Sequence, residues 1–215
     1  MLCRLSAGLV LKSRWRPYRA RPGERVLVFR TGSVFPPGHP SSRLCLELLD
    51  EVFAAGELAP ASRLLDVGCG SGVLMLAAAA RGVRRCVGVD LSRRAVLASW
   101  ENAVLNGLTG AVCLARGSTE SLRGPFQGIL ANLPLEVQMA KVAELDRLAA
   151  PGGWLILSGF KDTQEAALLA RYREEGWVLA RRRTRDQGAS ELPPDRSFTW
   201  AGWRLVRGSA SPAHS

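Results

Sequence analysis

Short apolar runs alternate with longer amphipathic stretches from residue 62 onward. A run of about four to eight apolar residues is typical of a buried strand, whereas apolar residues at every third or fourth position indicate a helix. This alternation predicts an α/β fold with a Rossmann-like, doubly wound, mostly parallel sheet. The last two runs are joined only by a polar loop with Pro193 and Pro194, so they predict an antiparallel strand pair at the carboxyl-terminal end. The expected strands span 63–67, 86–89, 111–115, 128–131, 154–158, 177–183 and 198–206, and the expected helices span 72–80, 92–106, 136–149 and 163–175.

The segment before this alternating region has fewer regular elements. Residues 25–30 predict a short strand with basic ends, and residues 31–42 form a loop rich in glycine and proline. Apolar residues then recur at helical spacing over 42–55, which predicts a helix with Ser41 or Ser42 as its N-cap.

The composition of the first residues predicts that they form an extension outside the main domain. Residues 1–22 contain several arginines and serines and no acid, a composition found in mitochondrial transit peptides. Lys12 interrupts the apolar stretch 9–11, which argues against a secretory signal. We expect a basic extension over 1–30, one domain over 31–207 and a disordered tail over 208–215.

Composition excludes several classes of protein. The chain has 215 residues, of which 47% are hydrophobic and 22% charged, so it can bury a sizeable core. Its longest apolar run, residues 73–80, is far shorter than the ~20 residues of a membrane-spanning helix. Five scattered cysteines without a CxxC pair, together with only two histidines, argue against a disulfide scaffold and a metal site. They fit a reducing compartment, which is the cytoplasm or alternatively the mitochondrial matrix.

The net charge of +10 is concentrated at the two ends of the chain. Residues 1–30 hold eight basic residues and one acid, for +7, and residues 171–215 hold nine and five, for +4. The middle, with twelve basic residues and thirteen acids, is nearly balanced at −1. Basic ends suit RNA, ribosomes or acidic protein surfaces, and the alternative is an arginine-rich solvated surface. Arg181, Arg182 and Arg183 allow the same two interpretations, as contacts to phosphate or as protection of an edge strand.

The sequence LLDVGCGSG at residues 64–72 carries the chemistry. Glycines allow a tight turn after the strand and bring a ligand against the backbone and the next helix. A dinucleotide fingerprint would need another glycine at Val73, and instead the GxGxG spacing follows an acid, Asp66. A second acid, Asp90, ends the next strand, where a carboxylate can bind the hydroxyls of a ribose. The pattern predicts a nucleoside cofactor, although Asp66 could also cap the following helix and Asp90 could start the next one.

LLDVGCGSG together with VGVD closely resembles the class I S-adenosylmethionine-dependent methyltransferases. The resemblance implies a seven-stranded sheet, a glycine loop that holds the methionine part of the cofactor, Asp66 near its amino group and Asp90 on the ribose. It also implies that Asn132, within the ILANLP segment that ends the fourth strand, lies at the methyl-transfer site. The residues expected to bind S-adenosylmethionine are Ser41, Ser42, Asp66, Gly68, Cys69, Gly70, Gly72, Asp90, Leu91 and Asn132.

The segments VFPPGHPSSRLCLELLD, ILANLPL and GGWLILSGF resemble the PrmA family, which methylates amino groups of large-subunit ribosomal protein eleven. The resemblance implies a protein substrate, with Asn132 and the backbone carbonyl of Leu133 orienting the acceptor nitrogen. His39 is either a base or a structural residue beside the cofactor. In place of the family's GTG and HPTT, the chain has Pro36-Pro37-Gly38 and then His39-Pro40-Ser41-Ser42. The family's amino-terminal substrate-recognition domain has no counterpart in about 30 residues.

Three functions follow from these observations. The first is amino-group methylation of a protein, in particular a ribosomal protein. The second is methylation of an RNA base or a small molecule on the same scaffold, with the basic ends holding RNA. The third, based on the altered PPG segment, is a catalytically silent adaptor that binds the cofactor.

Overall fold

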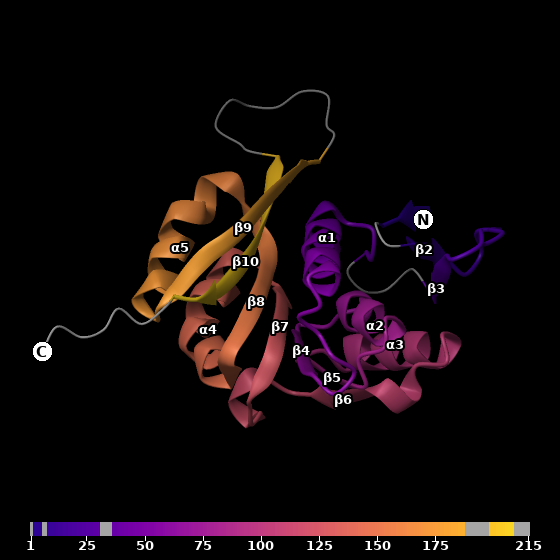
Figure 1. Cartoon of the computed structure of the whole chain (residues 1–215), viewed down its shortest axis with the longest axis horizontal. Helices are drawn as coiled ribbons and strands as arrows, with labels where there is room; N and C mark the ends of the chain where they lie inside the picture. Colours follow the sequence, from indigo (N-terminus) through magenta and orange to yellow (C-terminus); the bar gives the residue numbers. More distant parts are fainter. Residues whose placement is uncertain (1, 6–7, 31–35, 188–197, 209–215) are drawn as a thin grey trace, which may run out of the picture.

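The computed structural model describes residues 2–5, 8–30, 36–187 and 198–208, and its centre is a seven-stranded sheet (Figure 1). The strand order is β6-β5-β4-β7-β8-β10-β9, in which β10 runs antiparallel to both β8 and β9 and the other pairs are parallel. This confirms the predicted fold class, including the antiparallel pair. The strands are β4 (Arg63–Val67), β5 (Arg85–Asp90), β6 (Val112–Arg116), β7 (Phe126–Asn132), β8 (Ala149–Lys161), β9 (Trp177–Asp186) and β10 (Thr199–Arg207).

Helices cover both faces of this sheet and divide the core into two layers. One layer packs α1, α2 and α3 against the sheet, and α4 and α5 cover the opposite face (Figure 1). Each layer is filled with buried aliphatic and aromatic side chains, among them Trp154 in the first layer and Trp203 in the second. The helices are α1 (Pro40–Ala54), α2 (Val73–Ala80), α3 (Arg93–Leu105), α4 (Leu135–Leu148) and α5 (Glu165–Glu174), with short 3-10 turns at Thr109–Ala111, Thr119–Ser121 and Asp162–Gln164.

Several element boundaries differ from the sequence-based expectation, and the starts of α1 and β8 are two of them. The N-cap of α1 is His39, whose Nδ1 accepts from the Ser41 backbone N–H at 3.3 Å, so Ser41 and Ser42 already belong to the helix. Proline at the next position explains this start, because Pro40 has no N–H to satisfy and its fixed φ suits the first helical turn. Strand β8 begins at Ala149 rather than at residue 154, so Gly152 lies inside a strand with a φ of +69°.

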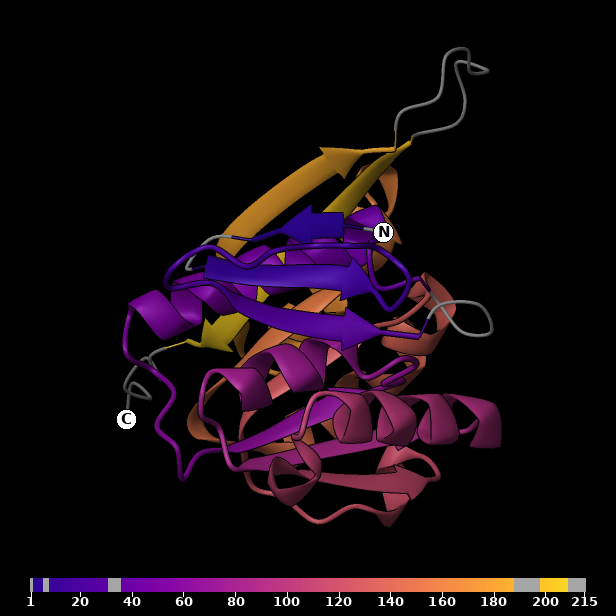
Figure 2. The same cartoon turned by 90° about the vertical axis from the view of Figure 1, so that its right-hand side faces the viewer.

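The amino-terminal residues form a second, three-stranded sheet that the hydrophobic pattern did not predict beyond its last strand. β1 (Leu2–Arg4) pairs antiparallel with β2 (Leu9–Ser13), which pairs parallel with β3 (Arg25–Phe29). Figure 2 shows this sheet in front of α1 and α2, and its buried side chains join the core layer that contains those helices.

Asn106, which follows α3, holds the last strand of the small sheet in place. Its Oδ1 accepts from the Val28 backbone N–H and its Nδ2 donates to the Val28 carbonyl, both at 2.8 Å. The amide thus replaces the neighbouring strand that β3 lacks on that side. The expected domain boundary at residue 30 stays a prediction. The expected loop with Pro193 and Pro194 and nearly all of the expected tail, 209–215, lie outside the described residues.

Candidate active site

The candidate site lies where the central strands β4, β5 and β7 end. Strand β4 pairs with β5 on one side and β7 on the other, and the connection after β4 and the connection after β7 lead to helices on opposite faces of the sheet (Figure 1). The strand order therefore reverses beside β4, and ligands of open α/β sheets bind in the crevice at such a point.

The glycine loop after β4 adopts a backbone shape that other residues rarely reach. Gly68, Gly70 and Gly72 have φ values of +66°, +56° and +77°. A Cβ on Gly68 would come within 2.4 Å of Leu133 Cδ2, so the loop packs directly on the end of β7. Cys69 is buried in this loop. Gly72 is the N-cap of α2 and does not line the cavities described below.

Asp66 is a buried acid beneath the loop, with 2% of its surface exposed. Its Oδ2 accepts from the Met75 backbone N–H at 3.1 Å in the first turn of α2. Burial raises the pKa of this carboxyl to about 7, a shift that the Met75 N–H opposes and the charge of Asp90 reinforces. Asp66 therefore does contact the following helix, and it also lines a small cavity with Ser42.

Asp90 is fixed by two backbone N–H groups. Its Oδ2 accepts from Gly70 at 3.0 Å and its Oδ1 accepts from Ser92 at 2.8 Å. The carboxylate thus joins the glycine loop to the start of α3, whose N-cap is Ser92. Each carboxylate oxygen can accept more than one hydrogen bond, so both can still accept from a ligand.

Three adjoining cavities surround these residues. The largest of them, about 400 Å³, is lined by Gly68, Gly70 and Asp90 on one side and by Asn132 on the other. A second, of about 260 Å³, continues past Asp90 to the largely exposed Leu91. The third, about 50 Å³, contains Asp66. Their combined extent suits an elongated small molecule, because ligand pockets usually measure ~300–1,000 Å³.

Asn132 lines the first cavity, and its amide oxygen is unsatisfied. Its Nδ2 donates to Ser42 Oγ at 3.2 Å, whereas its Oδ1 is buried without a hydrogen-bond partner among the described residues. Beside it, the Leu133 carbonyl lies against Gly159, where a Cβ would be only 2.3 Å from that oxygen. The sequence-predicted pair Asn132 and Leu133 therefore lies together on the wall of the cavity.

His39 contacts both the start of α1 and the cavity wall. Its Nδ1 lies 2.8 Å from Ser41 Oγ, and its ring meets the Trp200 ring edge-on, with centroids 4.8 Å apart. Burial lowers the pKa of His39, and the charge of Lys161 lowers it further. His39 thus caps α1 and packs on Trp200, and the choice between its two sequence-based roles stays a prediction.

The sequence analysis missed Trp200 and Gly159 as lining residues of the cavity. Strand pairing places Trp200 opposite Lys161, at the end of β8 where Gly159 forms a bulge. Gly159 within the apolar strand was a sequence signal for the bulge, but local sequence could not show that Trp200 pairs with Lys161.

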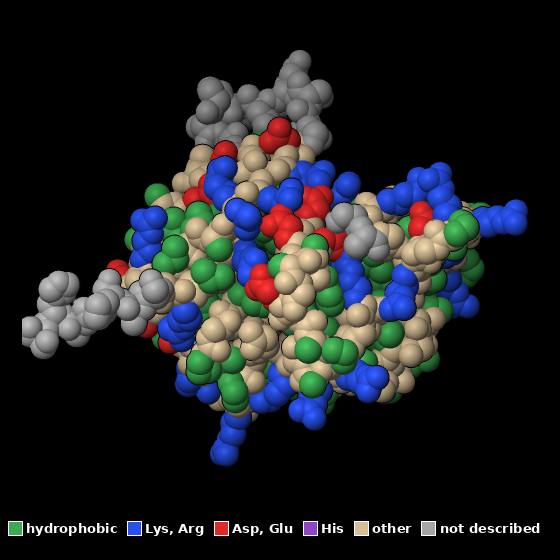
Figure 3. Space-filling view, in the orientation of Figure 1, with side chains coloured by type: hydrophobic (Ala, Val, Ile, Leu, Met, Phe, Trp, Pro, Cys, Tyr) green, Lys and Arg blue, Asp and Glu red, His purple; other side chains and the backbone are tan. Residues whose placement is uncertain are grey.

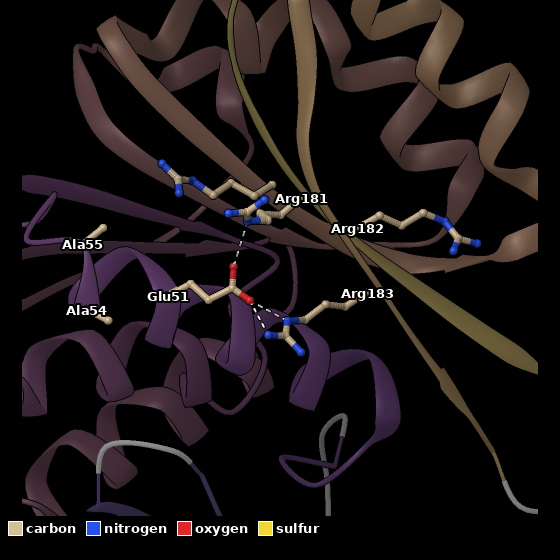
Figure 4. Close-up of a pocket in the computed structure, with 7 residues that line it drawn as sticks. Glu51, Ala54, Ala55, Arg181, Arg182 and Arg183 are labelled. Atoms are coloured by element: carbon tan, nitrogen blue, oxygen red, sulfur yellow. Dashed lines mark hydrogen bonds and ion pairs between the residues drawn. The ribbon is translucent and has the colours of Figure 1, made fainter.

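A larger cavity of about 510 Å³ lies elsewhere, between α1 and β9, and we call it the arginine groove; Figure 4 shows its lining. Glu51 of α1 pairs there with both Arg181 and Arg183, whereas Arg182 points away and pairs with Glu165 of α5. Figure 3 shows acidic and basic side chains interleaved where α1 lies beside β9. These pairs hold the outermost strand to α1, and they contain no nucleophile or acid–base pair.

No helix in the described part of the chain is long and apolar enough to cross a membrane. Within the same residues no three histidine, cysteine, aspartate or glutamate side chains gather in a way that could hold a metal ion.

Comparison with known proteins gives relatives of one family. The model of the ribosomal protein L11 methyltransferase (PrmA) family matches residues 3–189. Proteins named ribosomal protein L11 methyltransferase from Geobacter sp. (strain M21) and Gloeobacter violaceus are 40% and 38% identical over 172 and 174 residues. Those matches cover 79% and 80% of this chain but 56% and 52% of the relatives. The chain thus spans about half the length of the curated relatives it matches.

Solved structures agree on the fold. The ribosomal protein L11 methylase of Lactobacillus delbrueckii subsp. bulgaricus superimposes with a TM-score of 0.81 at 22% identity, over 97% of this chain and 98% of its own. Magnesium protoporphyrin IX methyltransferase of Synechocystis, solved with bound SAM, superimposes with a TM-score of 0.59 at 22% identity, over 78% and 82%. By the match of its family model over most of its length, the chain belongs to the ribosomal protein L11 methyltransferase (PrmA) family.

Proposed function

We propose that this protein transfers a methyl group from S-adenosylmethionine to an amino group of a protein, with a ribosomal protein as the substrate class. The observation that carries the proposal is the buried, unpartnered Oδ1 of Asn132 on the wall of the cavity that Asp90 and the glycine loop complete. A buried acceptor without a donor is costly, so it marks a place where a ligand N–H is expected.

The cavity residues fit S-adenosylmethionine. The Asp90 carboxylate is free to accept from the two ribose hydroxyls, and the second cavity beyond it offers Val137 and Leu91 to an apolar ring. Asp66 and the backbone of the glycine loop lie where a charged amino-acid end would enter the smallest cavity. The hydroxyls of Ser41 and Ser42 line the same region and are the donors available to a carboxylate.

The chain's own residues have a limited task in the chemistry. Bound S-adenosylmethionine supplies a methyl group on a sulfonium, which is a good leaving group, so no covalent protein nucleophile is needed. Asn132 Oδ1 and the Leu133 carbonyl accept N–H bonds from the substrate amine and aim its lone pair. Enclosure of the amine favours its neutral form, because burial destabilises an ammonium group. The proton is released to water before transfer.

Radiolabelled S-adenosylmethionine with a ribosome-rich extract tests the proposal. We expect label on material that protease removes and nuclease does not. Asn132→Ala should lower the transfer rate by ~100-fold or more, because the orientation of the amine is lost, with cofactor affinity nearly unchanged. Gln127→Ala is the matched control, because Gln127 lies on the same strand and bonds Gly152, away from the cavity.

Three results would contradict parts of this function. An Asn132→Ala variant as fast as the parent protein would remove the assigned role of the amide. Label that only nuclease removes would show an RNA acceptor instead. Cofactor binding in calorimetry without transfer to any fraction would identify a silent adaptor.

The five cysteines are free thiols, which is consistent with a protein that functions in a reducing compartment such as the cytoplasm.

The arginine groove supports a second candidate function, contact with an RNA backbone. Glu51 is shared by Arg181 and Arg183, so one guanidinium charge there is unbalanced. The Nε of Arg204, which lines the groove, is buried without a partner among the described residues. The planar guanidinium group of arginine can donate two hydrogen bonds at once to the oxygens of a phosphate.

The test is binding of a labelled single-stranded oligoribonucleotide at several salt concentrations. We expect affinity to fall with salt, and Arg181→Gln with Arg183→Gln to reduce the log–log slope by about 0.7 per lost phosphate contact. Arg171→Gln is the control, because Arg171 pairs with Glu174 on the exposed side of α5. A flat salt response, or equal slopes for the double variant and the control, would contradict RNA contact at the groove.

A further inference from the structure

A lysine of the chain itself, Lys161, packs against a residue that lines the cavity. Lys161 is the last residue of β8, and its strand partner on β10 is Trp200. Lys161 Nζ lies 3.6 Å from the centroid of the Trp200 ring and 5.8 Å from that of Phe198. Trp200 lines the same cavity as Asn132, so the amine contacts a side chain in the wall of the cavity proposed for methyl transfer.

Lys161 differs in its contacts from the other two lysines of the chain, Lys12 and Lys141. Lys12 Nζ donates to the Arg16 carbonyl, and Lys141 Nζ binds Ser118 and Glu120. No carboxylate within the described ranges lies within 4.0 Å of Lys161 Nζ. The amine instead contacts the faces of the Trp200 and Phe198 rings.

The surroundings also favour a reactive amine. Desolvation lowers the pKa of Lys161, and the charge of Asp162 opposes this shift only in part. His39, whose ring meets the Trp200 ring edge-on, has its pKa lowered by burial and by the charge of Lys161. A neutral amine is the form that can attack a sulfonium methyl group.

We propose that Lys161 is an internal methyl acceptor, to which the protein transfers a methyl group from its own bound S-adenosylmethionine. This rests on the proposed methyltransferase function. Rotation of the flexible lysine stem would carry Nζ from the Trp200 face into the cavity beside Asn132.

The atoms and electrons of this step balance. Lys161 Nζ first releases a proton to water. Its lone pair then forms the N–C bond while the C–S bond breaks, and the electron pair of that bond stays on sulfur. The products are a methylated lysine and S-adenosylhomocysteine. The lysine keeps its positive charge after methylation, and methylated ammonium groups bind aromatic faces well. The modified side chain therefore stays over Trp200.

The test uses the purified full chain with labelled S-adenosylmethionine and no other acceptor. We expect the intact mass to increase by one or more methyl groups, and peptide mapping to place them on Lys161. Lys161→Arg should abolish the increase, whereas Lys12→Arg should leave it unchanged. The rate per molecule should not change on dilution, because the transfer is intramolecular.

Several outcomes would overturn the inference. Methylation of Lys12, Lys141 or the chain's α-amino group at the same rate as Lys161 would show untargeted transfer. A chain that methylates a ribosomal protein but never itself would refute the internal acceptor and leave the proposed function standing. A chain that shows no binding of S-adenosylmethionine by calorimetry would refute both.

Discussion

Replacing Gly159 by alanine should damage both stability and methyl transfer. Gly159 has a φ of +99°, and a Cβ there would lie 2.3, 2.7 and 2.8 Å from the O, C and N atoms of Leu133. All three atoms belong to the backbone, so no side-chain rotation can relieve the overlap. Gly152 on the same strand is a matched control, because it also has a positive φ, +69°, but a Cβ there would meet nothing within 4 Å.

The two substitutions separate backbone strain from overlap. An alanine in a left-handed conformation costs ~1–2 kcal/mol, which is the whole effect expected for Gly152→Ala. Gly159→Ala adds a forced shift of packed structure worth ~1–3 kcal/mol, for a total of ~2–5 kcal/mol. Urea unfolding followed by circular dichroism measures both free energies of unfolding.

The same overlap should affect catalysis more than cofactor binding. Relief of the clash moves the Leu133 peptide, which adjoins Asn132 and is proposed to orient the amine. A displacement of about 1 Å can cost ~100-fold in rate, whereas Asp90 is on another strand and its ligand contacts need not change. Single-turnover transfer at saturating S-adenosylmethionine measures this rate. If the two alanine variants lose equal stability and Gly159→Ala reacts at the parent rate, the packing of Leu133 on Gly159 does not position the acceptor.

Three further predictions concern side chains that the structure holds by hydrogen bonds. Asp90→Ala should weaken S-adenosylmethionine binding by about tenfold or more, since a hydrogen bond to a charged group contributes ~1.5–3 kcal/mol, and calorimetry showing unchanged affinity would refute a ribose contact. The pKa of Asp66 is raised from 3.8 to about 7 in the folded protein. Asp66 therefore adds its full stabilisation to the folded state below pH about 4, and this stabilisation is lost as the pH rises through about 7. The free energy of unfolding of the parent protein should therefore fall relative to Asp66→Asn between pH 5 and pH 8 in urea titrations, and parallel pH curves would contradict it. Asn106→Ala removes both bonds to the Val28 backbone and should cost ~1–3 kcal/mol, with faster hydrogen exchange of the Val28 amide as its signature; unchanged exchange would contradict the assigned contact.

The main sheet could be predicted because its strands carry their own signal. A parallel strand buried on both faces is almost continuously apolar, as at Leu64 and Leu65, where it differs clearly from helical spacing. The turn after it is equally local, because glycines at 68, 70 and 72 all adopt positive φ. Strand ends and the acids beside them, Asp66 and Asp90, could therefore be located from the sequence.

The amino-terminal sheet lacked such a signal. Strand β1 has three residues and β2 has five, and each contains one basic residue near its carboxyl end. Strands this short are stabilised by what they pack on and not by their own propensity. For β3 that partner includes Asn106, which is 78 residues away from Val28 in the sequence. A local sequence pattern cannot predict a contact between residues so far apart in the chain.

The same distinction explains why the cofactor is easier to infer than the acceptor. The cofactor side of the cavity comes from one stretch of chain, the glycine loop and the strand after it. The side that we propose for the acceptor brings together His39 before α1, Lys161 at the end of β8 and Trp200 on the antiparallel strand β10. These residues meet only because the bulge at Gly159 sets the register of β10 against β8. A change of one residue in that register would turn Trp200 to the opposite face of the sheet, so the acceptor wall depends on tertiary pairing that local sequence patterns do not encode.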